Sequence, residues 1–168
     1  MIDNNDYINN MEVNFIKNIQ KIPRNDVKWF TKLMSVTSAP FHTNLYVIII
    51  LILYFLKKVS SLQISIICLS QLIIFCIKNI FKRKRPFESN NIKLLEPMIF
   101  DQYSFPSGHT LNAFLLSYIL KKNNIIDLNI IPYCVGLSRI FLGVHYPTDV
   151  IGGFLLSKII IMFLLKST

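Results

Sequence analysis

The sequence predicts an all-α membrane protein, a polytopic bundle of about five or six transmembrane helices preceded by amphipathic helices at the N-terminus. The first reason is composition, because 52% of the 168 residues are hydrophobic and only 16% are charged. A soluble domain usually carries about a quarter charged residues. The second reason is that the apolar residues gather in long runs ending in lysine or arginine, as membrane-spanning helices commonly do.

Residues 1–42 form the polar part of the chain. Apolar side chains recur there at near-helical spacing over residues 13–22, and a similar stripe follows over residues 27–34 after Pro23. Lysines lie between the apolar positions, so the pattern predicts two basic amphipathic helices on the membrane surface. The alternative is a pair of helices packed on the bundle. No cleavable signal peptide is expected, because the start lacks a basic stretch followed by an apolar one.

Residues 43–168 are expected to form a membrane-embedded bundle. A span needs about 20 residues, and the apolar runs predict five spans over residues 40–56, 59–81, 107–120, 125–142 and 147–165. A polar loop, residues 87–105, separates the second span from the third. The cysteines, Cys68, Cys76 and Cys134, lie inside apolar runs without zinc-like spacing, so we expect neither a disulfide nor a metal site.

The first chemistry-bearing motif is Lys78-x6-Arg85-Pro86, at the end of the second span. Residues seven apart fall on one face of a helix, and arginine offers a planar fork of donors that suits phosphate oxygens. Lys78 lies within an apolar run, where an ionisable side chain needs a partner or a function. The alternative is a basic anchor at the membrane interface.

The second motif is Pro106-Ser107-Gly108-His109, at the start of the third span. Ser107 is a good N-cap, and Gly108 lets the backbone approach an anion closely. The free N–H groups of the first helical turn then form an anion site. His109 beside this site is a candidate proton donor to a leaving oxygen. A plain capped helix start with an interfacial histidine is the alternative.

The third motif is Ser138-Arg139-x5-His145-x3-Asp149. A histidine and an aspartate four residues apart can lie on the same side of a helix. The carboxylate would fix the imidazole tautomer and stabilise its charged form. His145 is then a candidate nucleophile toward phosphorus, with Arg139 as a third positive group. The alternative is an interfacial histidine followed by an acidic residue at a helix start.

Topology gives an independent test of these motifs. If each span crosses once, the end of the second and fourth spans and the start of the third and fifth lie on the same membrane face. All three motifs occupy those positions, whereas unrelated matches would fall on either face. The remaining histidine, His42, stands alone before the apolar run of the first span, Leu45–Leu56, and is interpreted as an interfacial residue.

In their order and joint presence, the three motifs resemble the signature blocks of the type 2 phosphatidic acid phosphatase (PAP2, lipid phosphate phosphatase) superfamily. The resemblance covers residues 75–157, includes the Gly143–Gly153 stretch, and looks most like the small bacterial-type members. It implies a membrane phosphatase that hydrolyses a lipid phosphate monoester or pyrophosphate, such as phosphatidic acid, phosphatidylglycerol phosphate or a polyprenyl pyrophosphate.

The resemblance also implies a role for each residue. His145 would attack phosphorus and form a phosphohistidine, Asp149 would orient it, and His109 would protonate the leaving group and later activate water. The phosphoryl oxygens would be bound by Lys78, Arg85, Ser107, Gly108 and Arg139. No metal and no cofactor are expected. Two alternatives stay open: a non-enzymatic lipid-binding or scaffold protein that retains the motifs, and a vanadate-binding relative of the haloperoxidases.

The expected partners are the lipid bilayer and an anionic lipid substrate, in keeping with the net charge of +9. No nucleic acid partner is expected, and the sequence does not indicate an oligomeric state. Lysines flank the face opposite the site, which by the positive-inside rule would be cytoplasmic, although the site face is basic too. With the habit of the family, this favours a multi-pass protein whose site faces the extracytoplasmic side or a lumen.

Overall fold

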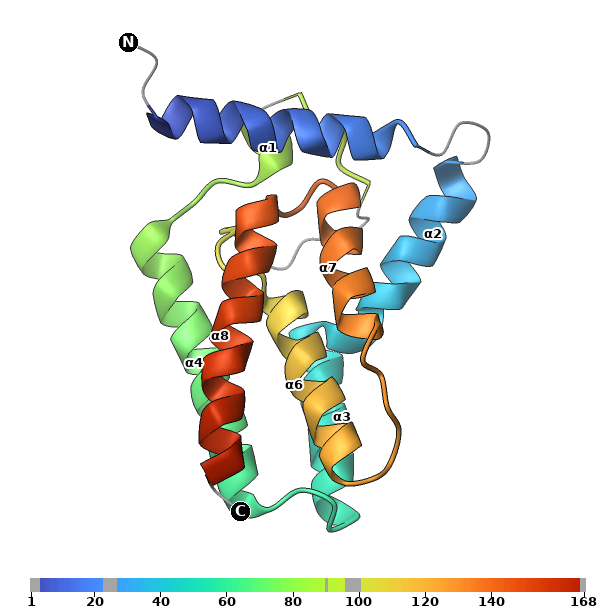
Figure 1. Cartoon of the computed structure of the whole chain (residues 1–168), viewed down its shortest axis with the longest axis vertical. Coiled ribbons are helices and arrows are strands. Elements are labelled where there is room, and N and C mark those ends of the chain that lie inside the picture. The colour runs from blue at the N-terminus through green and yellow to red at the C-terminus, as the bar shows by residue number, and fades with distance from the viewer. Residues whose placement is uncertain (1–3, 23–26, 90, 96–100, 167–168) are drawn as a thin grey trace.

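The computed structural model describes residues 4–22, 27–89, 91–95 and 101–166, and its regular elements in these ranges are all helices (Figure 1). The all-α prediction is therefore confirmed for the described chain. The helices are α1 (Asn4–Gln20), α2 (Val27–Ser38), the 3-10 helix η1 (Ala39–Phe41), α3 (Thr43–Phe55), α4 (Ser61–Phe81), α5 (Pro86–Ser89), α6 (Gly108–Lys122), α7 (Ile131–Phe141) and α8 (Pro147–Lys166). Pro23, the predicted break between the amphipathic helices, lies outside the described residues.

The helices form a bundle with α1 lying across one end (Figure 1). That end is where α4 finishes and α8 begins, and α4 and α8 run side by side from there to the opposite end. Helix α6 packs against both α7 and α8, and α2 packs against α7. The packing of α2 on α7 agrees with the bundle-packed alternative for the second amphipathic segment.

Helix α6 is the centre of the bundle. Residues 110–117 are buried without interruption, which is the pattern of a helix surrounded by other helices. Apolar clusters lie on both sides of it, one built around Tyr46 and Ile119 toward α3, the other around Leu115 and Leu164 toward α8. A site at the N-terminus of α6 is therefore enclosed by the bundle rather than displayed on its surface.

The outer face of α8 is apolar, with Ile151, Leu155 and Ile159 each just over half exposed at 54%, 54% and 53%. Their four-residue spacing forms a continuous stripe along the helix. Soluble monomers rarely expose a large contiguous apolar patch. The stripe therefore indicates a membrane protein.

Two segments of the described chain are long and apolar enough to cross a membrane: Ser61–Glu88, which contains α4, and Pro147–Leu164 in α8. Lys28–Phe41 and Thr43–Phe55 together make a third if the 48° bend between them belongs to one broken span. In that case the first predicted span, residues 40–56, would begin earlier, within α2. The number of passes stays a prediction.

The predicted fourth span, residues 125–142, is wrong in its length, because α7 covers only Ile131–Phe141. The preceding segment turns instead. Asp127 accepts hydrogen bonds from the backbone and side-chain amides of Asn129, at 3.1 and 2.9 Å. Such local side-chain bonds compete with helix formation, and Asn124 adopts a left-handed conformation at φ 52°.

Two glycines let α8 approach the loop that precedes α6. A Cβ at Gly153 would lie 2.5 Å from the carbonyl oxygen of Ser107, and one at Gly152 would lie 2.5 Å from the ring of Phe105. The backbone N–H of Ser107 donates to the carbonyl of Asp149 at 3.0 Å. The first turns of α6 and α8 are therefore joined directly, and this contact positions the residues of two motifs.

We expect Gly153→Ala to lower the thermal unfolding midpoint in detergent, because the added methyl group would meet backbone atoms that cannot move aside. Overpacking of this kind costs about 1–3 kcal/mol. Gly108→Ala is the matched contrast, since its Cβ would meet only the Ile74 side chain at 3.8 Å. Equal midpoints for the two variants would show that the close approach at Gly153 is not a constraint on the fold.

Candidate active site

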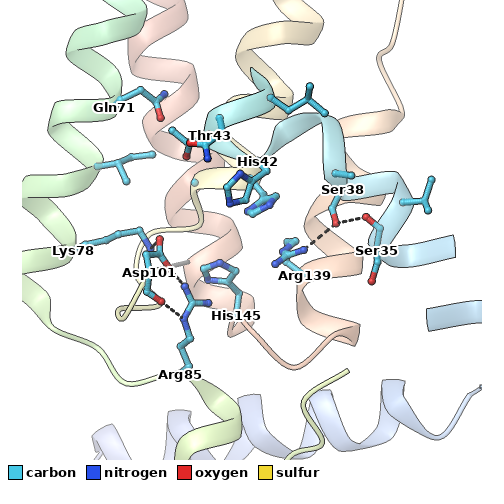
Figure 2. A pocket seen from close by; sticks show the side chains of 17 residues that line it. Ser35, Ser38, His42, Thr43, Gln71, Lys78, Arg85, Asp101, Arg139 and His145 are labelled. Atoms are coloured by element: carbon cyan, nitrogen blue, oxygen red, sulfur yellow. Dashed lines mark hydrogen bonds and ion pairs between the residues drawn. The ribbon is translucent and has the colours of Figure 1, made fainter. Parts of the chain in front are cut away.

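Six of the eight residues singled out by the sequence line one cavity (Figure 2). They come from four parts of the chain and are Lys78, Arg85, Gly108, His109, Arg139 and His145. The other two, Ser107 and Asp149, are fully buried. The structure thus brings the three motifs together at the end of the bundle that α1 covers.

Lys78 and Arg85 project into the cavity from the end of α4 and the segment that follows it. Lys78 Nζ donates to the carbonyl of Tyr103 at 2.6 Å, and Arg85 Nη1 donates to the carbonyl of Val144 at 2.8 Å. Both side chains are almost fully buried. Buried cations need partners, and these carbonyls hold the two charges in place.

The carboxylate of Asp101 bridges the same two cations (Figure 2). Asp101 Oδ2 lies 3.2 Å from Lys78 Nζ, and Oδ1 accepts a hydrogen bond from Arg85 Nη2. Asp101 itself is about half exposed. It therefore provides the negative charge at the position where an anionic ligand would meet both cations.

Arg139 reaches the cavity from the last turn of α7 and is also nearly buried. Its Nη1 donates to the hydroxyl of Ser38 at 2.9 Å, which ties it to the end of α2. Ser38 in turn donates to backbone carbonyls of its own helix. A third positive group is thus fixed on the side of the cavity opposite Lys78 (Figure 2).

His145 and Asp149 form the pair expected from their spacing. Nδ1 of His145 lies 3.4 Å from Asp149 Oδ2, and the same oxygen accepts from the backbone N–H of Tyr146 at 2.8 Å. Burial, together with the charges of Arg85, Lys78 and Arg139, holds the pKa of His145 well below its ordinary value. The imidazole is therefore neutral at physiological pH, and a neutral imidazole keeps a lone pair on one ring nitrogen, as a nucleophile requires.

The start of α6 has the predicted N-cap. The Ser107 hydroxyl accepts from the backbone N–H of Thr110 at 3.4 Å and from the Thr110 hydroxyl at 2.9 Å. Gly108 and His109 open the helix and line the cavity. Since the first N–H groups of a helix have no partner within it, this turn presents donors to an anion.

The interpretation of His42 as an isolated interfacial residue is wrong. It lines the same cavity, and its ring centroid lies 5.5 Å from that of His109. The reason is the bend between α2 and α3, where η1 packs against α6 and returns the chain to the centre of the bundle. All three histidines of the sequence therefore face one space.

Arg83 and Glu12 are two further charged residues at the site, and neither was predicted from the sequence. Arg83 lies between Lys78 and Arg85 in the first motif, and its Nη1 donates to Asp149 Oδ1 at 2.6 Å. Its Nη2 donates to Glu12 Oε2, also at 2.6 Å. The sequence gives one indication of a role for Arg83, which is its position inside the first motif. The role of Glu12 could not be predicted, because no local pattern indicates that α1 crosses this end of the bundle.

Beyond the charged residues, the cavity extends between the α2–α3 bend and α4. This part is lined by uncharged polar and apolar side chains, namely Ser35, Val36, Thr43, Asn44, Leu45 and Gln71. Within the described part of the chain, no group of three or more His, Cys, Asp or Glu side chains is arranged to hold a metal ion.

Known proteins share part of the sequence and the fold. Phosphatidylglycerophosphatase B from Bacillus subtilis is 41% identical over 78 residues, which cover 38% of this chain and 38% of that protein. Undecaprenyl-diphosphatase BcrC from Bacillus subtilis is 37% identical over 89 residues, which cover 51% of this chain and 46% of that protein. The similarity thus spans less than half the length of each of these curated relatives.

A solved structure, the transmembrane PAP2 type phosphatidylglycerolphosphate phosphatase from Bacillus subtilis, has a TM-score of 0.72 at 24% identity, covering 97% of this chain and 89% of its own. At this identity the likeness establishes the fold. The sequence model of the PAP2 superfamily matches residues 60–168, which is more than half of the chain and includes all eight predicted site residues. The chain belongs to the PAP2 superfamily.

Proposed function

We propose that the chain is an integral membrane phosphatase that hydrolyses a lipid phosphate monoester or pyrophosphate through a phosphohistidine at His145. The observation that carries the proposal is the convergence of a neutral, Asp149-paired histidine with three nearly buried cations on one cavity. The names of the relatives support the substrate class, because one is a phosphatidylglycerophosphatase and the other an undecaprenyl-diphosphatase.

In the first step, Nε2 of His145 attacks phosphorus as the bond from phosphorus to the leaving oxygen breaks. His109 gives its proton to that oxygen. Asp149 stabilises the positive charge that develops on the imidazole. In the second step, His109 takes a proton from water, the water oxygen attacks phosphorus, and the bond from phosphorus to nitrogen breaks to release inorganic phosphate.

Phosphoryl transfer depends mainly on positioning and on stabilising charge on the nonbridging oxygens. Lys78, Arg85 and Arg139 supply that charge, and the backbone N–H of Gly108 in the first turn of α6 supplies a hydrogen bond, whereas the Ser107 N–H is already bonded to the Asp149 carbonyl. Gly108 has no Cβ, so its backbone is open to the ligand. Packing does not explain the glycine, because a Cβ there would make only an ordinary contact with the Ile74 side chain.

The leaving group would occupy the uncharged part of the cavity. Hydroxyl and amide side chains beside Val36 and Leu45 suit a lipid that has both polar groups and an apolar chain. Phosphatidic acid, phosphatidylglycerol phosphate and polyprenyl pyrophosphates share this chemistry. The apolar stripe on α8 supports a substrate delivered from a bilayer.

We further propose that the chain crosses the membrane several times and that the site faces the extracytoplasmic side or a lumen. Helix α1 would lie in the interface, because it crosses the end of the bundle and exposes Met11 and Phe15 (Figure 1). We also propose an N-terminal segment, residues 1–42, and a membrane-embedded bundle, residues 43–168, with α2 of the N-terminal segment packed against α7 of the bundle.

The decisive test is phosphate release by the purified protein in mixed micelles from each of these lipids at equal surface concentration. We expect turnover of at least one lipid, and acid-labile phosphate on His145 when the reaction is quenched during turnover. His145→Ala should lower kcat by at least about 10³-fold, as loss of a catalytic nucleophile does. Phosphate release at the same rate by wild type and His145→Ala would refute the proposal.

We expect an excess of EDTA to change turnover by less than about twofold, because three fixed side-chain cations take the part that Mg²⁺ plays in other phosphoryl transfers. Turnover before and after extended dialysis against the chelator measures this. Loss of activity that returns with one added metal would contradict the assignment of charge stabilisation to Lys78, Arg85 and Arg139.

Asp101→Asn should tighten inhibition by orthovanadate, a phosphate analogue, by about tenfold, which corresponds to about 1.4 kcal/mol. The physical reason is that the Asp101 carboxylate competes with the anion for Lys78 and Arg85. The inhibition constant is compared with that of Glu88→Gln, which removes a nearby exposed carboxylate. Weaker inhibition of Asp101→Asn alone would mean that Asp101 aligns the cations instead of competing for them.

A further inference from the structure

A chain of alternating charges leads from His145 out of the cavity to helix α1. Asp149 uses Oδ2 toward the His145 ring and the backbone N–H of Tyr146. Its other oxygen, Oδ1, accepts from Arg83 at 2.6 Å. The orientation of the carboxylate that faces the nucleophile is therefore set on its far side by Arg83.

Arg83 is itself held by several contacts. Its Nη2 donates to Glu12 at 2.6 Å, its Nη1 donates to the Thr148 hydroxyl at 2.6 Å, and its guanidinium carbon lies 3.9 Å from the ring centroid of Tyr146. Stacking on the ring and bonding to two carboxylates together fix the orientation of the planar guanidinium group. Lysine, as a point charge on a flexible stem, would not reproduce it.

Glu12 also binds the first turn of α8 directly. Its Oε1 accepts from the backbone N–H of Thr148 at 2.8 Å and from the Thr148 hydroxyl at 2.7 Å. That N–H is one of the first-turn donors that the helix cannot satisfy, and a carboxylate there is favoured by the helix dipole. A residue of α1 thus caps the helix that carries Asp149.

Burial makes this arrangement rigid. Glu12 is 6% exposed and Asp149 is fully buried, and buried carboxylates without partners are costly. The carboxylate of Glu12 also balances the positive charge of Arg83. A lone Arg83 would weaken the ability of Asp149 to stabilise positive charge on His145, and the carboxylate of Glu12 offsets it.

We propose that Glu12 and Arg83 are positioning residues for the nucleophile, acting through Asp149, so that α1 completes the active site. Glu12 lies outside residues 60–168, the part of the chain that the family model matches. The inference rests on the proposed function, because it assigns His145 as the nucleophile.

The experiment compares Glu12→Gln, Arg83→Lys and the double variant with wild type. Glu12→Gln keeps the size of the side chain and removes its charge. We expect kcat and the rate of His145 phosphorylation to fall by about 10–100-fold, as small displacements of a reacting group do, with KM changed by less than about threefold. The double variant should be no slower than the slower single variant, because residues that act through one chain are not additive.

Two variants of α1 serve as matched controls. Asn14→Ala alters an exposed residue on the same helix and should leave kcat unchanged. Gln20→Ala removes the bonds from Gln20 to the carbonyls of Lys93 and Phe141, at 2.8 and 2.9 Å. It loosens the docking of α1 without touching Arg83. It should therefore lower the thermal midpoint, and it should lower kcat less than Glu12→Gln does.

A second readout does not depend on turnover. Histidine nitrogen NMR should show one neutral tautomer of His145 in wild type and a mixture in Glu12→Gln. If wild type releases no phosphate, the proposed function fails. The NMR comparison of the His145 tautomer in wild type and Glu12→Gln still tests whether Glu12 positions the imidazole. Unchanged kcat and tautomer in Glu12→Gln, additive effects in the double variant, or an equal loss of kcat in Gln20→Ala would each overturn the inference.

Discussion

The hydrogen bond from the Ser107 N–H to the carbonyl of Asp149 joins the first turns of α6 and α8, and the geometry of the site depends on it. The contact brings two helix N-termini, each with a positive dipole end, to one side of the cavity. It also fixes the start of α6 relative to Asp149, and therefore relative to His145. Gly153 permits this distance because any larger residue would meet the Ser107 carbonyl.

The bundle has buried charged side chains inside and exposed apolar side chains outside. Lys78, Arg85 and Arg139 are nearly buried, while side chains on the outer face of α8 are half exposed and apolar. Backbone carbonyls, the Ser38 hydroxyl and the Asp101 carboxylate hold the cations. A site of this kind is preorganised, since its charges are fixed before an anion arrives.

The sequence predicted the residues that lie at helix ends, because short motifs fix their own local geometry and topology places them on one face. It could not predict His42, Asp101 or Glu12, whose positions depend on the bend between α2 and α3, on a loop and on the path of α1. The predicted span over residues 125–142 failed for a related reason. Hydropathy averaged over that window obscured the turn made by Asp127 and Asn129.

Helix α1 has two faces with different surroundings. Met11 and Phe15 are exposed, whereas Glu12, next in sequence to Met11, is bound to Arg83 and to the first turn of α8. Displacing this helix outward would therefore separate Glu12 from Arg83 in the same movement. The fold thereby links a mechanical variable, the height of one helix above the bundle, to the electrostatic surroundings of a single imidazole.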